Sequence, residues 1–535
     1  MLRIAVAQFN ATVGDLTGNV ERILKCASEA KARGAHVLLT PELALCGYPP
    51  EDLLLRPDFY RACSRALDEL AAAAGDIILV VGHPDEFEGY CYNAASVIEH
   101  GRRRAVYRKG RLPNYDVFDE RRYFEPGSDT CVVTLGGVRC GINICADIWE
   151  PGAFEAAHAA GAELMLVLNA SPCHLEKQQE RTRVLGERIA ATGIPAIYCN
   201  LVGGQDELVF DGASFALDAR RQLCMRLPQF EAALGLVEFS AGRLSSQDLA
   251  SELSLEAEAY AALVLGVRDY LGKSGFPGAI IGLSGGIDSA LTLCVAVDAL
   301  GADKVRAVMM PSPYTAQMSL DDSREMVRLL GVRYDEIAIE PAMNTYAAML
   351  DPLFAGLPAD TTEENIQARI RGNILMALSN KTGSLVLTTG NKSEMAVGYC
   401  TLYGDMAGGF AVIKDVYKTL VYRLSRYRNT ISTVIPENII VRPPSAELKP
   451  GQVDQDSLPE YEVLDAIVRA YMEEDRSPRE IIAAGLPEAA VRRVVRLLRI
   501  AEYKRRQAPV GIRITPRGFG KDWRYPITNR YTDEF

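Results

Sequence analysis

The sequence lacks the segments that carry a protein into or across a membrane. No run of about 18 apolar residues is present. The first residues, MLRIAVAQFNATVGD, have no basic segment followed by a small-residue cleavage site. The 12 cysteines lie at irregular intervals without a CxxC pair, so we expect reduced thiols in a cytoplasmic protein. Basic character is also missing, because the formal charge of −11 argues against a nucleic-acid partner.

What is present is a long chain of ordinary globular composition, with 48% hydrophobic and 24% charged residues. Its 535 residues are too many for one core, because single cores stop growing near about 250–300 residues. We therefore expect two domains, over residues 1–245 and 255–535. The polar, serine-rich stretch FSAGRLSSQDLASELS (Phe239–Ser254) is the predicted linker.

Short apolar runs alternate with alanine-rich helical runs along both halves. In the first half we expect strands over Leu2–Phe9, His36–Thr40, Asp76–Gly82, Ala94–Glu99, Val138–Cys145, Leu164–Asn169 and Ala196–Leu201, and helices over Asn19–Arg33 and Lys177–Thr192. In the second half we expect strands over Ala279–Leu283, Val305–Met310, Tyr334–Ile339 and Leu385–Thr389, and helices over Leu255–Leu271, Leu320–Leu330 and Glu364–Ser379. The second series predicts a parallel sheet with crossover helices.

The stretch AIIGLSGGIDSALTL (Ala279–Leu293) predicts a strand, a tight loop and the start of a helix. Backbone N–H groups at a helix start bind anions, and glycines let a phosphate approach the main chain. The Walker form GxxxxGK[ST] is absent. Asp288 would repel phosphates unless Mg²⁺ lay between them. A plain glycine-containing turn is the alternative, but Ser-Gly-Gly-x-Asp-Ser at a strand end favours a phosphate site.

This loop resembles the pyrophosphatase-type loop of ATP-dependent adenylating enzymes, a group that includes NAD, GMP and asparagine synthetases and tRNA-thiolating enzymes. Longer runs resemble the NAD synthetases: TEENIQARIRGNILMALSN, TTGNKSEMAVGYCTLYGDMAGGFAVIKDVYKT, RPPSAELKPGQVDQDSLPEYEVLD and EYKRRQAPVGIRIT. The resemblance implies ATP contacts at Gly282, Leu283, Ser284, Gly285, Gly286, Ile287, Asp288, Ser289 and Thr389. It implies deamido-NAD contacts at Asn365, Glu394 and Lys504, with Glu394 also helping to hold Mg²⁺.

A reacting triphosphate needs cations around it. The candidates are Lys392, Lys414, Lys418, Arg369 and Lys504. Helix-surface charge is the alternative, and it stays open for Lys392 and Lys414. Arg369 and Arg371 share one predicted helix, and one of the two could simply be solvated.

In the first half, Glu42, Lys109 and Cys145 each lie where an apolar strand ends. A thiol is a poor nucleophile until a base removes its proton, and a nearby lysine can stabilise the thiolate and the developing oxyanion. The three residues are therefore a coherent set for attack on an amide. Taken separately, each has a plainer explanation: a core cysteine, a helix-capping glutamate and a surface lysine.

Their contexts, TPELALCGYPPEDLL, KGRLPNYDVFDERRYF and GINICADIW, resemble the glutaminase branch of the nitrilase superfamily. The resemblance implies that Glu42 is the general base, that Cys145 forms a thioester and that Lys109 stabilises the tetrahedral intermediates. It implies an orienting role for Glu120 and glutamine contacts at Tyr115, Ser171 and Lys177. Ala146 replaces the glutamate that we associate with the form Cys-Glu-Asp-Ile-Trp, and we expect altered tuning rather than lost activity.

The two resemblances together imply the fold and the reaction. We expect an α/β protein with a nitrilase-like α-β-β-α sandwich and a Rossmann-like, doubly wound parallel sheet. The implied reaction is ATP-dependent amidation of deamido-NAD⁺ with ammonia from glutamine, in a homo-oligomer with small-molecule substrates and no membrane or nucleic-acid partner. GMP or asparagine synthetases, tRNA-modifying enzymes, and an amidase whose second half only senses nucleotide are the alternatives.

Overall fold

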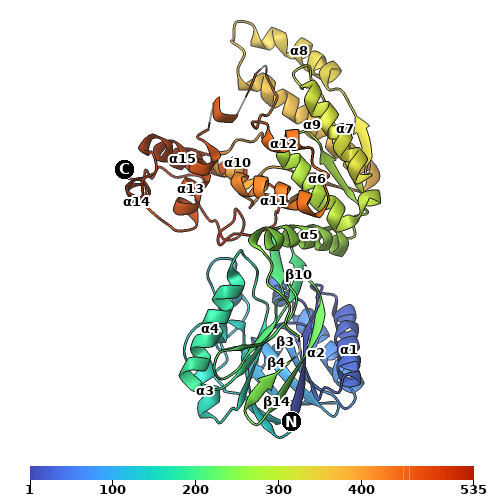
Figure 1. The fold of residues 1–535 in the computed structure, drawn as a ribbon, viewed down its shortest axis with the longest axis vertical. Helices are drawn as coiled ribbons and strands as arrows, with labels where there is room; N and C mark the ends of the chain where they lie inside the picture. Colours follow the sequence, from blue (N-terminus) through green and yellow to red (C-terminus); the bar gives the residue numbers. More distant parts are fainter. Residues whose placement is uncertain (247, 450, 453, 457) are drawn as a thin grey trace. The chain divides into compact units, whose positions relative to one another are not determined.

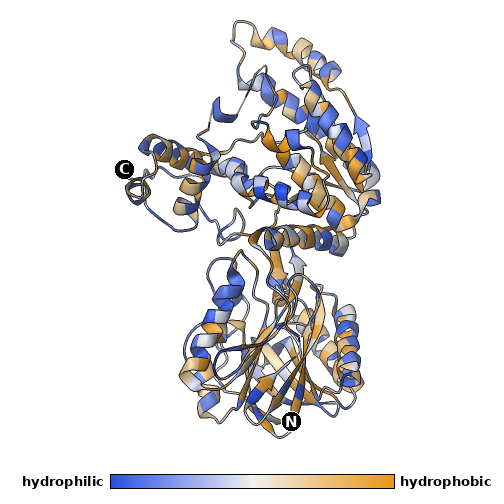
Figure 2. Cartoon of the chain, in the orientation of Figure 1, coloured by the Kyte–Doolittle hydropathy of each residue, from blue (hydrophilic) through white to orange (hydrophobic). Residues whose placement is uncertain are grey.

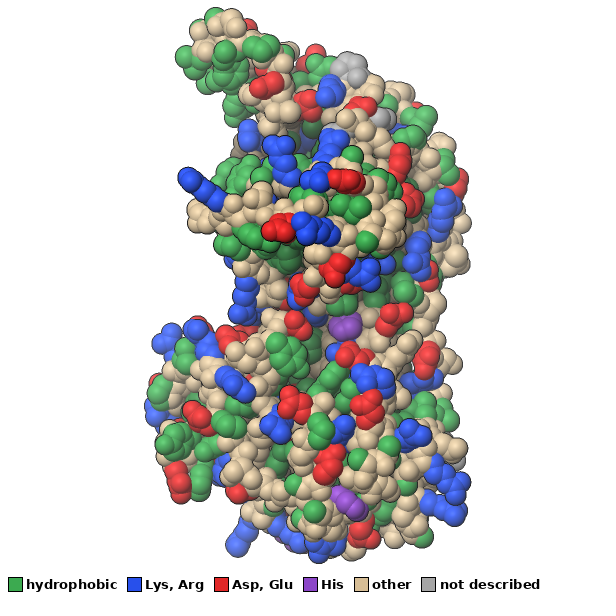
Figure 3. All heavy atoms as spheres, turned by 90° about the vertical axis from the view of Figure 1, so that its left-hand side faces the viewer, with side chains coloured by type: hydrophobic (Ala, Val, Ile, Leu, Met, Phe, Trp, Pro, Cys, Tyr) green, Lys and Arg blue, Asp and Glu red, His purple; other side chains and the backbone are tan. Residues whose placement is uncertain are grey.

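The chain folds as two units, Met1–Leu255 and Glu256–Phe535 (Figure 1). The computed structural model describes residues 1–246, 248–449, 451–452, 454–456 and 458–535. Within these ranges, no helix is both long and apolar enough to cross a membrane. Figure 2 shows hydrophobic residues along the central strands, and Figure 3 shows acidic and basic side chains interspersed over the face that it draws.

Two mixed sheets form the centre of the first unit. The seven-stranded sheet runs in the order β15 (Arg243–Ser245), β14 (Ala233–Ser240), β1 (Leu2–Gln8), β2 (Val37–Leu39), β3 (Ile78–Phe87), β4 (Tyr90–Glu99) and β5 (Arg102–Arg108). The six-stranded sheet runs in the order β13 (Leu223–Arg226), β12 (Phe215–Leu217), β9 (Ala196–Asn200), β8 (Leu164–Asn169), β7 (Val138–Ile144) and β6 (Val132–Leu135). A small hairpin joins β10 (Val202–Gln205) to β11 (Leu208–Asp211).

Alternation along the strands creates the layers of this unit. Leu2, Ile4 and Val6 of β1 belong to the same buried cluster as Leu164 and Leu166 of β8, between the two sheets. The residues between them in the chain point to the opposite face of each sheet, because successive strand side chains alternate. Burying both faces requires a further layer on each side. The predicted α-β-β-α sandwich is confirmed.

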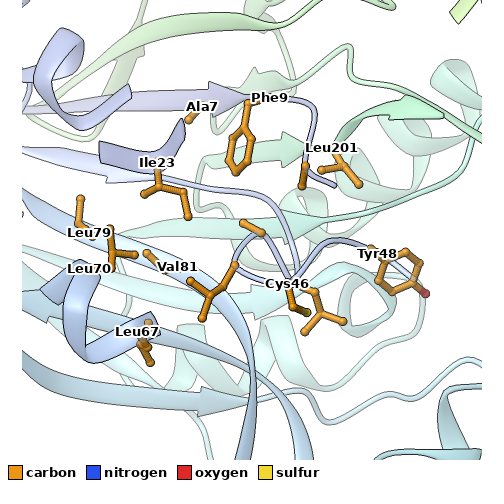
Figure 4. Close-up of a cluster of buried hydrophobic side chains, with 14 of the residues drawn as sticks. Ala7, Phe9, Ile23, Cys46, Tyr48, Leu67, Leu70, Leu79, Val81 and Leu201 are labelled. Atoms are coloured by element: carbon orange, nitrogen blue, oxygen red, sulfur yellow. The ribbon is translucent and has the colours of Figure 1, made fainter. Parts of the chain in front are cut away.

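Helices supply those outer layers. They are α1 (Leu16–Ala32), α2 (Pro57–Ala73), α3 (Ala153–Ala159) and α4 (Lys177–Thr192), with short 3-10 turns at η1 (Glu51–Leu55), η2 (Glu120–Arg122) and η3 (Cys145–Ile148). Side chains of α1 and α2, such as Ile23, Leu67 and Leu70, pack with Leu79 of β3 in one cluster (Figure 4). Side chains of α3 and α4 pack on the other sheet in a second cluster.

The predicted linker is shorter than the sequence indicates. β14 extends to Ser240, and β15 pairs with it, Phe239 opposite Leu244. Both of these side chains are buried, so residues 239–245 complete the edge of the seven-stranded sheet instead of joining the units. A hairpin with small polar residues at its turn has the same composition as a linker. Gln247, also within the predicted linker, lies outside the described residues.

The second unit contains a five-stranded sheet in which every pair is parallel. Its order is β18 (Arg333–Glu336), β17 (Val305–Met309), β16 (Ala279–Gly282), β19 (Leu385–Thr388) and β20 (Phe410–Ala411). The chain runs outward from β16 in one direction and then returns to its other side with β19. The boundary between β16 and β19 is therefore a topological switch point, where open α/β sheets bind ligands. The predicted doubly wound parallel sheet is confirmed.

The helices of this unit begin with α5 (Leu255–Ser274) and connect or follow the strands. They are α6 (Ile287–Leu300), α7 (Gln317–Leu330), α8 (Glu340–Phe354), α9 (Thr361–Thr382), α10 (Lys392–Val397), α11 (Lys418–Ile431), α12 (Glu437–Val441), α13 (Tyr461–Met472), α14 (Pro478–Ala483), α15 (Glu488–Ile500) and α16 (Glu502–Arg505), with 3-10 turns at η4 (Ala302–Lys304) and η5 (Asp454–Asp456). Apolar side chains of α9, including Ile370 and Leu375, pack on Ile280 of β16 and Val386 of β19.

We expect Leu166→Ala to lower the free energy of unfolding of the first unit by about 2–5 kcal/mol, because it leaves a cavity between two close-packed sheets. Leu223→Ala, at a 37% exposed position on β13, is the control and should change it by less than about 1 kcal/mol. Urea unfolding can be followed by Trp149 fluorescence in a Trp523→Phe background, because each unit holds one of the two tryptophans. Equal effects of the two leucine substitutions would contradict the assigned layers.

Candidate active sites

The three candidate catalytic residues of the first unit follow three different strands. Glu42 lies shortly after β2, Lys109 directly after β5 and Cys145 directly after β7. The first two strands belong to the seven-stranded sheet and β7 to the six-stranded sheet. Each residue is at most 5% exposed. The fold therefore brings residues that are distant in sequence into one buried cluster where the two sheets meet.

Lys109 holds two carboxylates together. Its Nζ donates to Glu42 Oε1 at 2.6 Å and to Glu120 Oε1 and Oε2 at 2.8 and 2.9 Å. Glu42 Oε1 also accepts from Asn93 Nδ2 at 2.8 Å, and Glu42 Oε2 accepts from the backbone N–H of Ala170 at 2.9 Å. Both oxygens of Glu42 are thus oriented by donors. A carboxylate fixed in this way is suited to accept a proton from one direction.

The Cys145 thiol lies within the electrostatic influence of this pair. Burial and the negative charge of Glu42 raise the pKa of Cys145 well above its usual value, while Lys109 acts in the opposite direction. Burial alone would lower the pKa of Lys109, but the charges of Glu120 and Glu42 raise it well above its usual range. The lysine therefore stays protonated while the thiol stays neutral. Attack by this sulfur needs a proton acceptor, and Glu42 is the nearby group that can serve.

Glu120 links the cluster to an apolar wall. Tyr48 OH donates to Glu120 Oε1 at 3.0 Å, and its ring belongs to the hydrophobic cluster drawn in Figure 4. Burial raises the pKa of Glu120 to about 7, against the opposing effect of Lys109. A mostly apolar pocket lies beside this carboxyl group, with Leu43 and Phe118 in its lining. Lys109 is thus held by Glu120 as well as by Glu42.

The three residues expected to contact an amide substrate lie around the thiol. Tyr115 and Lys177 both interact electrostatically with Cys145, and Ser171 follows Ala170, whose N–H binds Glu42. Tyr115 is 55% exposed. Lys177 Nζ lies 4.1 Å from the centroid of the Trp149 ring, and burial lowers its pKa.

Sequence reasoning missed the residue that fixes Ser171. Arg181 on α4 is fully buried; its Nε donates to Ser171 Oγ at 3.1 Å and its Nη2 to Ser171 O at 2.8 Å. Its Nη1 pairs with Asp211 at 2.8 Å. Two arginines, Arg181 and Arg183, lie close together on α4, so sequence alone does not show which one is buried.

The predicted phosphate loop lies at the switch point of the second unit. Gly285 has a φ of +79°, and a Cβ there would lie 2.7 Å from Ser319 O, so this position requires glycine. Ser284 Oγ lies 3.0 Å from Ser289 Oγ and accepts from the N–H of Gly286 at 3.2 Å. These bonds hold the loop in a tight turn before the N-terminus of α6, where N–H groups attract anions.

The other expected nucleotide contacts lie along the same edge of the sheet. Gly282 ends β16, Leu283 follows it, and Ile287 begins α6. Thr389 follows β19, the parallel neighbour of β16. The carboxyl ends of these two strands therefore bring the predicted residues together.

Asp288 is the centre of a charged cluster beside the loop. Lys418 Nζ pairs with Asp288 Oδ2 and lies 3.5 Å from Glu394 Oε1, and Asn391 Nδ2 donates to Asp288 Oδ1 at 2.9 Å. Burial and the charge of Asp288 raise the pKa of Glu394 to about 8. Asp454 also raises it. This is a concentration of negative charge that one lysine only partly balances.

Asn365 and Lys504 meet at a different loop. Asn365 Oδ1 accepts from Thr401 Oγ1 at 2.7 Å, and Lys504 Nζ donates to the carbonyls of Gly398 and Cys400 at 2.8 and 2.7 Å. This loop directly follows α10, the helix that carries Glu394. The three predicted deamido-NAD residues therefore converge on α10 and the loop after it.

Two of the candidate cations, Lys392 and Lys414, are buried and bind groups inside the second unit. Lys392 is fully buried, and its Nζ binds Asp415 Oδ1 at 2.8 Å, Glu473 Oε1 at 2.6 Å and Thr515 Oγ1 at 2.6 Å. Surface charge, the alternative considered for Lys392, is wrong, because this lysine is an internal structural tie. Lys414 is also buried and donates to Pro509 O at 2.8 Å.

Of the two arginines expected on one helix, Arg369 is the solvated one, and Arg442 supplies charge that the motifs did not indicate. Arg371 on α9 donates from Nε to Met310 O at 3.0 Å, and burial lowers its pKa to about 10. Arg369 on the same helix is exposed and binds Leu402 O. Arg442 Nη2 donates to Gly285 O at 2.5 Å, directly on the phosphate loop.

Comparisons with known proteins cover both units. A family model described as NAD synthase matches residues 259–508, and one described as carbon-nitrogen hydrolase matches residues 3–247. A glutamine-dependent NAD(+) synthetase of Acinetobacter baylyi is 50% identical, with 98% of each chain covered, and one of Thermotoga maritima is 45% identical over 99% of each. The solved structure of a glutamine-dependent NAD+ synthetase from Acinetobacter baumannii in complex with ADP is 44% identical, with a TM-score of 0.81 over 100% of both chains.

We expect Glu42→Gln to lower the pKa of the Cys145 thiol, because the negative charge of Glu42 raises it, while burial and Glu120 would still act against the positive charge of Lys109. The measurement is the pH dependence of alkylation by iodoacetamide, read by mass spectrometry on the peptide that holds Cys145. Glu187→Gln, on the exposed face of α4, is the control and should leave the midpoint unchanged. An unchanged or higher midpoint in Glu42→Gln would show that the two groups do not interact.

Proposed function

The chain belongs to the glutamine-dependent NAD(+) synthetases, and we propose that its first unit releases ammonia from glutamine while its second unit activates deamido-NAD⁺ with ATP. The overall reaction is ATP-dependent formation of the NAD⁺ amide, with AMP, pyrophosphate and glutamate as co-products. The observation that carries the assignment of roles is a pair of clusters: Lys109, buried between two glutamates beside a thiol, and Lys418, paired with two partly buried carboxylates beside a phosphate loop.

In the first unit, Glu42 accepts the Sγ proton of Cys145 as the sulfur attacks the carboxamide carbon of glutamine. Lys109 stays cationic and stabilises the negative charge that develops on the carbonyl oxygen. The carbon–nitrogen bond then breaks, the proton on Glu42 passes to the departing nitrogen, and a thioester remains. Water that is deprotonated by Glu42 hydrolyses the thioester to glutamate. Tyr115 and Lys177 bind the substrate on the exposed side of the thiol.

Ser171 completes this binding wall. Its backbone is held by Arg181, so its position does not depend on the substrate. An ordered wall lowers the entropy cost of binding and keeps the amide carbon in line with the sulfur. Ala146 adds no charge to this wall, and the three catalytic roles do not require any.

In the second unit, the carboxylate of deamido-NAD⁺ attacks the α-phosphorus of ATP and pyrophosphate leaves. Ammonia then attacks the acyl adenylate at its carbonyl carbon, and AMP leaves. The backbone N–H groups of the loop from Ser284 to Ser289 and the start of α6 bind the phosphates. Arg371 and Lys418 supply positive charge to the pyrophosphate. Thr389 contacts the nucleotide from the end of β19.

Asn365, Glu394 and Lys504 bind deamido-NAD⁺ in this proposal. Two of them are attached to the loop after α10 by hydrogen bonds to Thr401, Gly398 and Cys400. Movement of that loop would therefore change the substrate site as a whole. An amidase whose second unit only senses nucleotide would not need a cation held between carboxylates at the phosphate loop.

Mg²⁺ fits the carboxylates beside the phosphate loop. It usually takes one or two protein carboxylates, with water and substrate phosphates as the remaining ligands. Asp288 and Glu394 supply that donor set, and no preformed group of three or more metal-ligating side chains is found among the described residues. Bound with ATP, the ion would neutralise phosphate charge. Lys418 Nζ only partly balances the two carboxylates when no ion is bound.

We further propose that the protein is a cytoplasmic homo-oligomer. The support is its resemblance to nitrilase-like domains, which usually associate through their sheet and helix layers. Twelve free cysteines, none of them in a disulfide, agree with a reducing compartment.

We expect Cys145→Ala to abolish glutamine-driven NAD⁺ synthesis and to leave ammonium-driven synthesis within about twofold of the unmodified protein, because the second unit does not use the thiol. Cys140→Ala is the matched control, since Cys140 is a buried cysteine on β7, the strand that directly precedes Cys145. It should keep both activities. NAD⁺ formation from deamido-NAD⁺ and ATP, with either nitrogen source, is the measurement. Loss of both activities in Cys145→Ala would contradict the division of roles.

We expect Asp288→Ala to lower synthesis from either nitrogen source by about 100-fold or more, because it removes a charge positioned at the reacting phosphates. Glutamine hydrolysis should persist. The control is Asp303→Ala, at an exposed position in the same unit. Release of pyrophosphate and of glutamate should be measured separately on each variant. Normal pyrophosphate release by Asp288→Ala would exclude the proposed role of the loop.

A further inference from the structure

Asp147 occupies all of its hydrogen-bonding capacity on groups next to the catalytic residues. Its Oδ1 accepts from the backbone N–H groups of Gly110 at 3.0 Å and Arg111 at 2.8 Å. Its Oδ2 accepts from the N–H of Ile144 at 2.9 Å and from Tyr107 OH at 2.8 Å. The side chain is fully buried. Four donors on one carboxylate leave it a single orientation.

These donors come from both sheets. Tyr107, Gly110 and Arg111 lie at and beyond the end of β5, on the edge of the seven-stranded sheet. Ile144 ends β7 in the six-stranded sheet. Gly110 directly follows Lys109, and Ile144 directly precedes Cys145. The carboxylate therefore bridges the two sheets through the backbone on either side of the lysine and the cysteine.

The cysteine needs such support because its backbone is strained. Cys145 has a φ of +40°, in the left-handed region that non-glycine residues rarely adopt. A residue in this region keeps its conformation only when its surroundings determine it. Asp147 lies in the same 3-10 turn as the cysteine, η3. Its carboxylate accepts from the N–H of Ile144, the residue directly before the cysteine.

We propose that Asp147 is the positioning residue that sets where Lys109 Nζ and Cys145 Sγ lie relative to each other, by binding the backbone beside both. The inference rests on the proposed function, in which Cys145 attacks glutamine and Lys109 stabilises the developing negative charge. Asp147 itself touches no reacting atom. A second connection between the sheets, from the N–H of Ala170 to Glu42, fixes the base in the same way. Together these two carboxylates place a three-residue site that spans two sheets.

Accepting all four of these hydrogen bonds requires the two oxygens of a carboxylate. An asparagine at the same place can accept on one oxygen only, and its NH₂ group would face two of the four donors. Asp147→Asn therefore breaks one half of the bridge and leaves the volume almost unchanged. Tyr107→Phe removes one of the four bonds without placing donors against each other. The two variants form a graded pair.

The test compares Asp147→Asn and Tyr107→Phe with Asp218→Asn. Asp218 also accepts backbone N–H groups, from Arg220 and Gln222 at 2.8 Å each, in a turn without any candidate residue, so it is the matched control. For Asp147→Asn we expect kcat for glutamine hydrolysis to fall about 100-fold, as for a displacement of about 1 Å, with KM much less affected. Tyr107→Phe should fall less. The control should match the unmodified protein.

Two further readouts separate positioning from loss of folding. Ammonium-driven synthesis should remain unchanged in every variant, because it needs only the second unit. The midpoint of Cys145 alkylation against pH should rise in Asp147→Asn, because Lys109 lowers the pKa of the thiol and would lie farther away. Alkylation reports this geometry whether or not the protein uses glutamine, so it stays informative even if Cys145→Ala overturns the proposed function.

An unchanged kcat and an unchanged alkylation midpoint in Asp147→Asn would overturn the proposal. A loss of kcat that is accompanied by loss of ammonium-driven synthesis and by a lower melting temperature would overturn it as well, because that pattern indicates a folding defect. If Asp147→Asn does not fold, Tyr107→Phe decides the question. It must raise the alkylation midpoint and lower kcat without changing KM for the proposal to stand.

Discussion

A buried lysine paired with two carboxylates is the interaction on which each active site depends. Lys109 lies between Glu42 and Glu120, and Lys418 lies between Asp288 and Glu394. Removing a charge from water costs several kcal/mol, which only close partners and good hydrogen-bond geometry can offset. Each lysine therefore offsets part of the free-energy cost of removing its two carboxylates from water. With the lysine removed, two buried like charges would repel each other, and one would take up a proton.

The same interaction has different consequences in the two units. In the first unit, Lys109 binds both Glu120 and Glu42, and the proposed function gives Glu42 the exchange of a proton with the thiol. In the second unit, the pKa of Glu394 is raised to about 8, so the cluster is short of positive charge. A site short of positive charge accepts a cation together with its anionic substrate. In the proposed function, a polyphosphate that carries Mg²⁺ would meet both requirements.

Much of this arrangement could be predicted from the sequence. The strand ends that carry Glu42, Lys109 and Cys145 were visible as apolar runs, and Ser284–Ser289 has the pattern of a phosphate loop. The burial of individual cations could not be predicted, because Lys392 and Lys418 lie in similar local contexts. Only the tertiary fold decides that Lys392 meets Asp415 and Glu473 while Lys418 meets Asp288. Arg181 and Asp147 were missed for the same reason, since the tertiary fold brings them to Asp211 and Tyr107, which lie 30 and 40 residues away in the chain.

Ala146 shows how the thiol depends on the charge around it. It lies directly after Cys145 in the same turn and is 8% exposed. Burial, Glu42 and Glu120 already raise the pKa of the thiol, while Lys109 and the backbone N–H of Ala170 act in the opposite direction. A glutamate in place of Ala146 would add a negative charge to this turn and raise that pKa further. Ala146 adds no charge, so Glu42 is the acidic residue with the largest effect on the pKa of the thiol. We therefore expect the departure from Cys-Glu-Asp-Ile-Trp to alter the tuning of the thiol and not to remove its activity.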